Sequence, residues 1–473
     1  MAKRKKSTFE RLQKGEGNRQ QRRELQRQLN AAEPGLEVVH RDAAGIDIGN
    51  ASHFVAVPPD RDPEPVREFG SWTADLKRMA AWLKGCGIRT VAMQSTGVYW
   101  IAVQEVLEQE GLEVYLVNAR GTKNLPGRKS DVQECQWLMK LHTYGLLRNS
   151  FRPPDNIRAV RTIWRLRDRC VVAAGRCIQQ IQKALTTMNV QLANTISDVG
   201  GVTGLAIIRA IVRGVRDPWE LAGLRDRRVA ASEEEIAHGL QGNWREDVLF
   251  ELDQVVQEYD FHHARIADCD EKLESYMAAL PTRRMAAEEP AAASSKRGRR
   301  RNCPNFDLRG ALQRVLGVDV TAVDSIDVLT GEVLLSEVGP DLSAFPTENH
   351  FAAWLLLTPR QEVSGGRVIR HVRAEGSSRL ANALRMAAQS LSHSDSYLGA
   401  RYRSLRGRLG APRANKAMAR YLACLLYRLL TKGEAYVDRG AEQYEKRRTE
   451  QDRRALERKA AAHGLKLVPV AQT

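Results

Sequence analysis

The chain has 473 residues, of which 43% are hydrophobic, so we expect a folded protein of two or three domains rather than a disordered one. Its formal net charge is +16, with 73 Lys and Arg against 57 Asp and Glu, which favours nucleic acid as a partner over basicity that serves solubility alone. There is no membrane-spanning apolar run, no secretory signal and no Cys-x-x-Cys zinc pair, so we expect a cytoplasmic protein with no membrane contact and reduced thiols.

Residues 1–40 are predicted to form a basic N-terminal arm, and residues 41–153 an α/β domain. Apolar alternation predicts strands at 43–49, 53–58, 66–72, 89–94 and 112–118, and helical spacing predicts helices at 74–85, 99–109 and 131–144. Three strands followed by alternating helices and strands is the order of a ribonuclease-H-like domain, although order alone is a weak signal.

Two long heptad-like seams indicate a helical arm over residues 154–281. The first seam runs from Trp164 through Val171 and Ile178 to Leu192, and the second runs from Leu252 to Leu280. We expect an antiparallel coiled-coil hairpin or a dimerising arm, with a small helical insertion at 197–245; an ordinary helical bundle is the alternative.

The rest of the chain is predicted to hold a linker, a second domain and a tail. Residues 282–305 read as a basic low-complexity linker, and residues 306–433 as a mainly α C-terminal domain. This domain opens with LQRVLGVDVTAVDSI, which is similar to a helix-hairpin-helix element, and closes with the basic helical stretch from Arg401 to Lys432. Residues 434–473 form a charged tail.

Four side chains with oxygen ligands lie where predicted strands end and a helix begins. Asp47 lies near the end of the first apolar strand and Gln94 ends the fourth, while Asp131 and Glu134 open a helix and project from one face. Taken singly, each has a common structural role at a strand end or in a first helical turn. In a ribonuclease-H-like sheet the first and fourth strands are neighbours, so we expect the four to converge on one or two Mg²⁺ ions.

A serine in the C-terminal domain is a candidate nucleophile. We expect an apolar helix to end at Pro359 and a loop to present Ser364 before two glycines, which let a backbone approach a ligand closely. A loop serine beside glycines is usually a turn residue, and that reading remains open. The surrounding positive charge would hold a phosphodiester near the hydroxyl, and it comes from Arg360, Arg367, Arg370 and Arg373.

Two further basic groups are candidate nucleic-acid contacts. The loop before the third acidic position contributes Arg120, Lys123, Arg128 and Lys129. The start of the helical arm carries a stripe without interleaved acids, made of Arg158, Arg161, Arg165 and Arg169. A solvated helix face is the alternative for the stripe, whereas phosphate contact is typical of such unbroken basic spacing.

Several blocks in order make the chain resemble the DEDD-type transposases of the insertion-sequence one-ten family. They are GIDIG, MQSTGVYW, LVNARGTKNLPGRKSDVQECQWLMKLHTYGLL, LGVD and FAAWLLLTPRQEVSGG, and together they span about residues 43–433. The resemblance implies a RuvC-like N-terminal domain joined by a coiled coil to a C-terminal transposase domain. It also implies magnesium at four acidic positions and a serine that attacks DNA.

Matched position by position, Asp47 and Asp131 correspond to the first and third acids of the family. Glu134 replaces an aspartate, and Gln94 replaces a glutamate, which removes one negative charge and is expected to weaken metal binding. Ser364 corresponds to the nucleophile of the family.

These observations and the resemblance predict a transposase, or DNA recombinase, of a bacterial insertion sequence that cuts and rejoins DNA through a serine nucleophile with a magnesium-binding acidic cluster. Such a protein is expected to be associated with the nucleoid. The resemblance further implies a structured guide RNA encoded by the element, and the arm favours a homo-oligomer, a dimer or a tetramer. Two alternatives remain: a metal-dependent nuclease or Holliday-junction resolvase, and a catalytically impaired relative that only binds nucleic acid.

Overall fold

The computed structural model describes residues 36–94, 97–118, 130–283, 302–364, 367–372, 376, 378–433 and 440–466. The chain divides into two compact units, residues 1–152 with 360–373, and residues 153–359 with 374–473. Within the described ranges, no helix combines the length and the apolar character needed to cross a bilayer.

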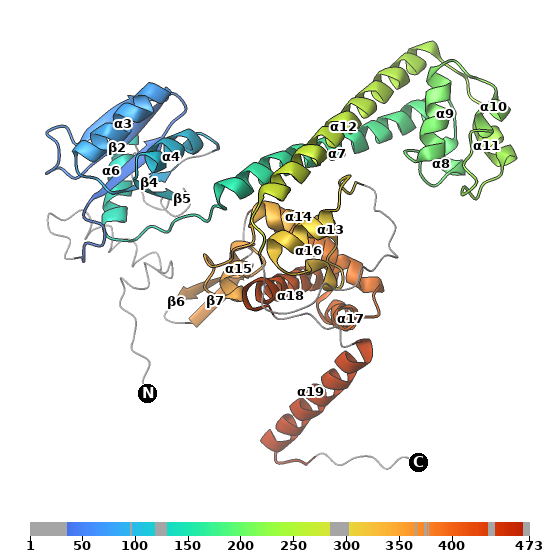
Figure 1. The fold of residues 1–473 in the computed structure, drawn as a ribbon. Helices are drawn as coiled ribbons and strands as arrows, with labels where there is room; N and C mark the ends of the chain where they lie inside the picture. The colour runs from blue at the N-terminus through green and yellow to red at the C-terminus, as the bar shows by residue number, and fades with distance from the viewer. Residues whose placement is uncertain are drawn as a thin grey trace. The chain divides into compact units, whose positions relative to one another are not determined.

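The first unit contains a five-stranded mixed sheet (Figure 1). Its strands are β1 (Ala43–Ile48), β2 (Ser52–Ala56), β3 (Val66–Gly70), β4 (Thr90–Gln94) and β5 (Glu113–Val117). The order across the sheet is β3-β2-β1-β4-β5, antiparallel from β3 to β1 and parallel from β1 to β5. This confirms the predicted element order and the ribonuclease-H-like character of the unit.

Helices cover both faces of this sheet because its central strands are apolar on both sides. Alternate side chains of β1, among them Ile46, join a core with α3 (Thr73–Gly85) and α4 (Trp100–Gln109). The opposite face packs against α6 (Asp131–Thr143), and a Cβ on Gly45 would lie 2.2 Å from the carbonyl oxygen of Cys135. Only glycine permits this approach of helix to strand.

The second unit begins with the predicted long helix pair, α7 (Asp155–Thr187) and α12 (Glu246–Ala279) (Figure 1). Arg167 contacts Asp270 and Cys177 approaches Glu258, so the two helices run antiparallel. The segment between them packs on the far end of the pair, and its helices are α8 (Leu192–Thr195), α9 (Val202–Val212), α10 (Pro218–Ala222) and α11 (Glu233–Gly239).

The buried stripe of α7 departs from the predicted heptad seam. Cys170 and Cys177 are buried where Val171 and Ile178 were expected, and Arg167 lies within the stripe. A straight helix of 3.6 residues per turn drifts away from a strict seven-residue repeat, and the arginine is accommodated because α12 supplies a carboxylate opposite it.

The C-terminal part of the second unit is mainly helical, as predicted. Its α-helices are α13 (Leu308–Leu316), α14 (Val328–Glu337), α15 (Glu348–Trp354), α16 (Arg379–Ser390), α17 (Tyr397–Leu409), α18 (Ala411–Lys432) and α19 (Ala441–Ala462). Gly317, with φ 76°, ends α13, and a short 3₁₀ turn over Val320–Ala322 leads to α14. The predicted charged tail therefore includes a 22-residue helix, α19.

A two-stranded hairpin, β6 (Arg360–Ser364) and β7 (Arg367–Val372), follows α15 and corrects two local expectations. The apolar helix ends at Trp354 rather than at Pro359, because Leu356 has φ 61° and the backbone turns there. Ser364 is the last residue of β6, not part of an irregular loop. The apolar run that predicted a longer helix instead buries Leu355 and Leu357 beneath the turn.

Candidate active site and nucleic-acid contacts

Two of the four predicted metal ligands are partners on adjoining parallel strands. Asp47 of β1 lies opposite Gln94 of β4 in the sheet register, at the carboxyl ends of both strands. Gln94 is buried and Asp47 is half-buried. Side chains two residues apart in a strand share a face, so Asp47 faces α6 as Gly45 does. Gln94 shares a face with Thr90.

Contacts with α6 show which face Thr90 occupies. Its hydroxyl lies 2.9 Å from Nε2 of His142, so β4 presents Thr90, and with it Gln94, towards α6. Burial lowers the pKa of His142 to about 3, which keeps the ring neutral under this contact.

The first turn of α6 supplies the other two predicted ligands. Ser130 caps the helix, and its side chain accepts a hydrogen bond from the backbone N–H of Gln133. In return, the side-chain oxygen of Gln133 accepts a hydrogen bond from the backbone N–H of Ser130. Asp131 is exposed and Glu134 is half-buried. The capping box fixes where the helix starts, and so it fixes which acidic residues stand in its first turn.

The buried thiol of Cys135 in α6 is influenced by one acid from the strand and one from the start of the helix. Burial raises the pKa of Cys135 to about 12, with smaller contributions from the negative charges of Asp47 and Asp131. Asp47 comes from β1 and Asp131 from the start of α6, one turn before Cys135. The structure therefore brings the strand pair and the helix start to one face and one edge of the sheet.

The donor chemistry of this edge fits a hard divalent cation. Three carboxylates and one amide are all oxygen ligands of the kind that Mg²⁺ prefers. Within the described ranges, no group of three or more His, Cys, Asp or Glu side chains is arranged to hold a metal ion. Mg²⁺ often takes only one or two carboxylates and completes its shell with water and substrate phosphate, so the open arrangement is compatible with a site completed by DNA.

The candidate nucleophile lies at the tip of the hairpin. Ser364 is the register partner of Arg367 across β6 and β7. Arg367 and Arg370 are exposed on β7, beside the exposed side chains of Val368 and Ile369. Arg360 is the first residue of β6. Arg373 lies outside the described residues, as do Arg120, Lys123, Arg128 and Lys129.

Two arginines of the predicted basic stripe on α7 have partners within the protein. Arg161 donates hydrogen bonds to the backbone oxygens of Ser336 and Glu337, at 3.0 and 2.7 Å. Arg165 donates to both carboxylate oxygens of Glu337, at 2.9 and 2.7 Å. Both guanidinium groups thus join α7 to the C-terminal end of α14, where cations are favoured by the helix dipole. Arg158 pairs with the exposed Asp155, and Arg169 is exposed.

A buried ionic cluster that was not predicted from the sequence lies at the same place. Arg167 pairs with Asp270 between α7 and α12, and both are nearly inaccessible to solvent. Burial raises the pKa of the adjacent Glu332 to about 7, against the opposing influence of Arg167. The signal in the sequence was the position of Arg167, three residues after Trp164 and three before Cys170, inside an otherwise apolar stripe.

Two family models match the chain. One for DEDD transposases of IS110, described as Transposase, matches residues 44–190, which include Asp47, Gln94, Asp131 and Glu134. A second, described as Transposase IS116/IS110/IS902 family, matches residues 319–403, which include Ser364. No curated protein matches the chain. With the ribonuclease-H-like sheet, the long helix pair and the two matched regions in family order, the chain belongs to the IS110 family of transposases, enzymes that carry out DNA transposition.

Proposed function

We propose that this transposase cuts and rejoins DNA through the hydroxyl of Ser364, and that Asp47, Gln94, Asp131 and Glu134 form the magnesium site that supports the reaction. The observation that carries the proposal is the register pairing of Asp47 with Gln94 on the face covered by α6, whose first turn carries the two remaining acids. Oxygen donors from β1, β4 and the start of α6 lie on the side of the sheet that α6 covers, and this arrangement supports a shared role.

The four ligands divide their roles by position. Asp47 and Gln94 are held by the sheet, so they fix where a cation would lie, whereas Asp131 is exposed and remains available to an ion shared with DNA. When bound, Mg²⁺ would neutralise phosphate charge at the reacting phosphodiester. The amide of Gln94 offers an oxygen ligand without a charge, so affinity depends more heavily on the three carboxylates.

Ser364 is proposed to act as a covalent nucleophile. Its hydroxyl gives up its proton as Oγ forms a bond to phosphorus, the bond from phosphorus to one deoxyribose oxygen breaks, and that oxygen takes up a proton and leaves as a hydroxyl. The protein–DNA ester keeps the energy of the phosphodiester, so a second DNA hydroxyl can reverse the step and rejoin the strands. Arg367, the register partner of Ser364, and the exposed Arg370 are placed to screen the phosphate charge.

The two matched regions support joint action of these two sets of residues. Asp47, Gln94, Asp131 and Glu134 fall in one region and Ser364 in the other, and both regions match models of the same transposase family. The serine and the metal ligands are therefore proposed to act on the same DNA rather than in separate reactions.

A denaturing-gel experiment tests the proposal against a metal-dependent nuclease or Holliday-junction resolvase. Ser364→Ala is expected to bind DNA normally but to form neither a covalent adduct nor recombinant product, and Ser364→Cys to keep at most a trace of adduct. A wild-type adduct that persists in Ser364→Ala would place the nucleophile elsewhere. Metal-dependent cleavage that survives Ser364→Ala would favour the nuclease, and binding without any cleavage would favour an impaired relative.

We also propose a structured RNA partner and a homo-oligomer. The family resemblance and the net charge of +16 support the RNA, because a polyanion larger than one DNA site would match so large a cationic surplus. The long antiparallel arm supports assembly, because it projects a long two-helix surface. Sequencing of RNA that co-purifies with the protein, and its mass in solution, test these two proposals.

A further inference from the structure

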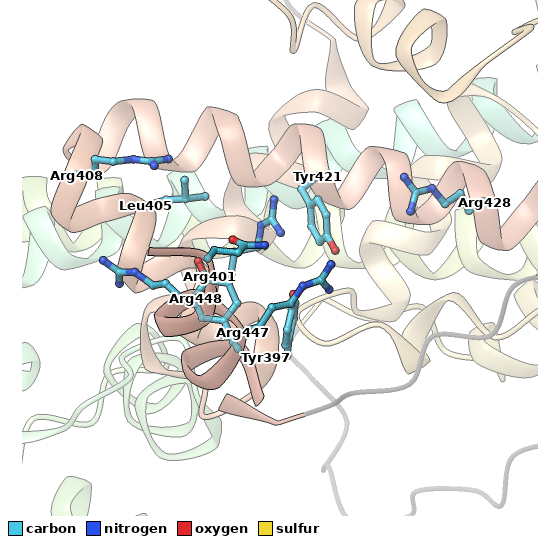
Figure 2. Close-up of a pocket in the computed structure, with 10 residues that line it drawn as sticks. Tyr397, Arg401, Leu405, Arg408, Tyr421, Arg428, Arg447 and Arg448 are labelled. Atoms are coloured by element: carbon cyan, nitrogen blue, oxygen red, sulfur yellow. The ribbon is translucent and has the colours of Figure 1, made fainter. Parts of the chain in front are cut away.

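A cavity of about 430 Å³ opens between α17, α18 and α19, none of which carries a residue of the proposed active site. Figure 2 shows the side chains that line it, and they are dominated by two chemical types. Five are arginines, three are tyrosines, and no described acidic residue is among them: Tyr397, Arg401, Leu405, Arg408, Tyr421, Arg428, Tyr444, Arg447, Arg448 and Gln451.

Helical spacing explains why these residues share one space. On α17 the lining positions are 397, 401, 405 and 408, on α18 they are 421 and 428, and on α19 they are 444, 447, 448 and 451. Each set recurs every three, four or seven residues, so each helix turns one face to the cavity. One face of the basic stretch at 401–432 therefore lines the cavity.

The charge of the cavity is only partly compensated. Arg428 pairs with Glu348, and Arg448 lies 3.7 Å from Asp452. Within the described ranges, no carboxylate pairs with Arg401, Arg408 or Arg447. Arg401, Arg408 and Arg447 therefore have no carboxylate partner in the described part of the chain, and their positive charge favours an anionic ligand.

The aromatic rings make the cavity different from a simple phosphate site. The guanidinium of Arg401 stacks over the ring of Tyr421, 3.9 Å from its centroid, and its buried Nε has no hydrogen-bond partner in the described part of the chain. Tyr397 and Tyr444 meet edge to face across α17 and α19. Flat π faces next to arginines are the combination that binds an unstacked base together with its phosphate.

We propose that this cavity binds an unpaired nucleotide of a single-stranded nucleic acid, with the base against Tyr421 and Arg401 and the flanking phosphates on Arg408 and Arg447. The proposal rests on the chain acting on nucleic acid, and it adds a site distinct from the metal ligands and from Ser364. Its volume falls within the range of small-ligand pockets and suits one nucleotide rather than a duplex, which presents no free base face.

The test measures binding by the full-length protein of a fluorescent oligonucleotide of about ten nucleotides, as single-stranded DNA, as single-stranded RNA and as a duplex. Arg447→Glu is compared with Lys446→Glu, a neighbour on α19 with the same charge change that lines a different surface. Both positions are exposed, so neither variant threatens the fold. Arg447→Glu should weaken single-strand binding about tenfold and lower its salt slope by about 0.7, with Lys446→Glu close to the parent.

A second variant tests the base contact. Tyr421→Ala should weaken single-strand binding about tenfold while leaving duplex binding unchanged, and Tyr421→Phe, which keeps the ring, should restore it. The DNA and RNA strands distinguish which polymer is preferred. Equal losses for Arg447→Glu and Lys446→Glu, equal losses on strand and duplex, or displacement of the strand by polyglutamate as readily as by unlabelled strand would each overturn the proposal. Binding is scored without strand transfer, so failure of the serine mechanism would leave these results unaffected.

Discussion

Arg165 and Glu337 form a bidentate ion pair that joins α7 to α14. Nε and Nη2 of the arginine donate to the two carboxylate oxygens, at 2.9 and 2.7 Å. Glu337 is almost buried and also lies 3.6 Å from Arg161 and 3.9 Å from Arg379. One carboxylate thus balances three guanidinium groups contributed by α7 and α16.

Removal of this carboxylate should loosen α14. Glu337→Ala leaves Arg161 and Arg165 without their carboxylate, whereas Arg379 keeps Asp168 at 3.0 Å, so we expect the opening free energy of α14 to fall by about 2 kcal/mol, measured by amide hydrogen exchange. Arg165→Ala should cost less, about 1 kcal/mol, because that side chain is 43% exposed.

The exposed Arg169 serves as the control for this pair. Arg169→Ala should leave hydrogen exchange unchanged and instead flatten the salt dependence of nucleic-acid binding by about one unit of slope. If Arg165→Ala behaved as Arg169→Ala does, its guanidinium would face phosphate, as the sequence alone suggested.

Because Glu332 is buried, the free energy of unfolding of the region where α7 meets α14 should fall as pH rises. Burial raises its pKa from 4.5 to about 7. Between pH 4.5 and pH 7, Glu332 is therefore protonated in the folded state and ionised in the unfolded chain. The folded state binds more protons in this window, and stability therefore decreases from about pH 4.5 to about pH 7, by roughly 3 kcal/mol.

Glu332→Gln should remove that dependence and make the protein more stable at neutral pH, as followed by hydrogen exchange in α7 and α14. His142 offers an internal contrast, because its pKa is lowered to about 3 and its region should instead lose stability as pH falls below 6.5. If hydrogen-exchange protection of α14 depended on pH in Glu332→Gln as it does in the parent, Glu332 would not titrate in this range.

The acidic edge should bind magnesium through both the strand and the helix. Asp131→Ala is expected to weaken Mg²⁺ binding by about tenfold and to abolish transposition without unfolding the protein, because Asp131 is exposed and Ser130 still caps α6. Gln94→Glu should tighten Mg²⁺ binding by a similar factor, since it restores a charge beside Asp47. Calorimetric titration measures both effects, with Asp155→Ala as a first-turn control. A parental titration curve for Asp131→Ala would remove it from the site.

The contact between β1 and α6 depends on one glycine. Gly45→Ala would place a Cβ 2.2 Å from the Cys135 oxygen and 2.3 Å from the Met139 nitrogen, so we expect a loss of about 3 kcal/mol or a displaced α6. Gly85→Ala is the control, because a Cβ added at that position would meet nothing within 4 Å. Thermal unfolding of the two variants side by side decides the matter: equal melting temperatures would mean that α6 adjusts without cost.

Much of the first unit was predictable because its signals are local. Alternating apolar residues gave all five strands, and the Ser130 capping box with Asp131 set the start of α6. The hairpin was not predictable in this way, since three consecutive leucines before Pro359 suit a helix as well as a buried turn, and the positive φ of Leu356 depends on its packing.

Sequence by itself determined which residues could carry chemistry: the four oxygen ligands, Ser364 and the arginines, because residue type and spacing fix what a side chain can donate or bind. Tertiary structure alone decided which of them meet. Asp47 and Gln94 are 47 residues apart and become neighbours only through the parallel pairing of β1 with β4. Arg165 looked like a phosphate contact until α14, from far along the chain, brought Glu337 against it. A partner distant in sequence leaves no trace in local periodicity, because spacing reports only which face a residue occupies and not what lies opposite that face.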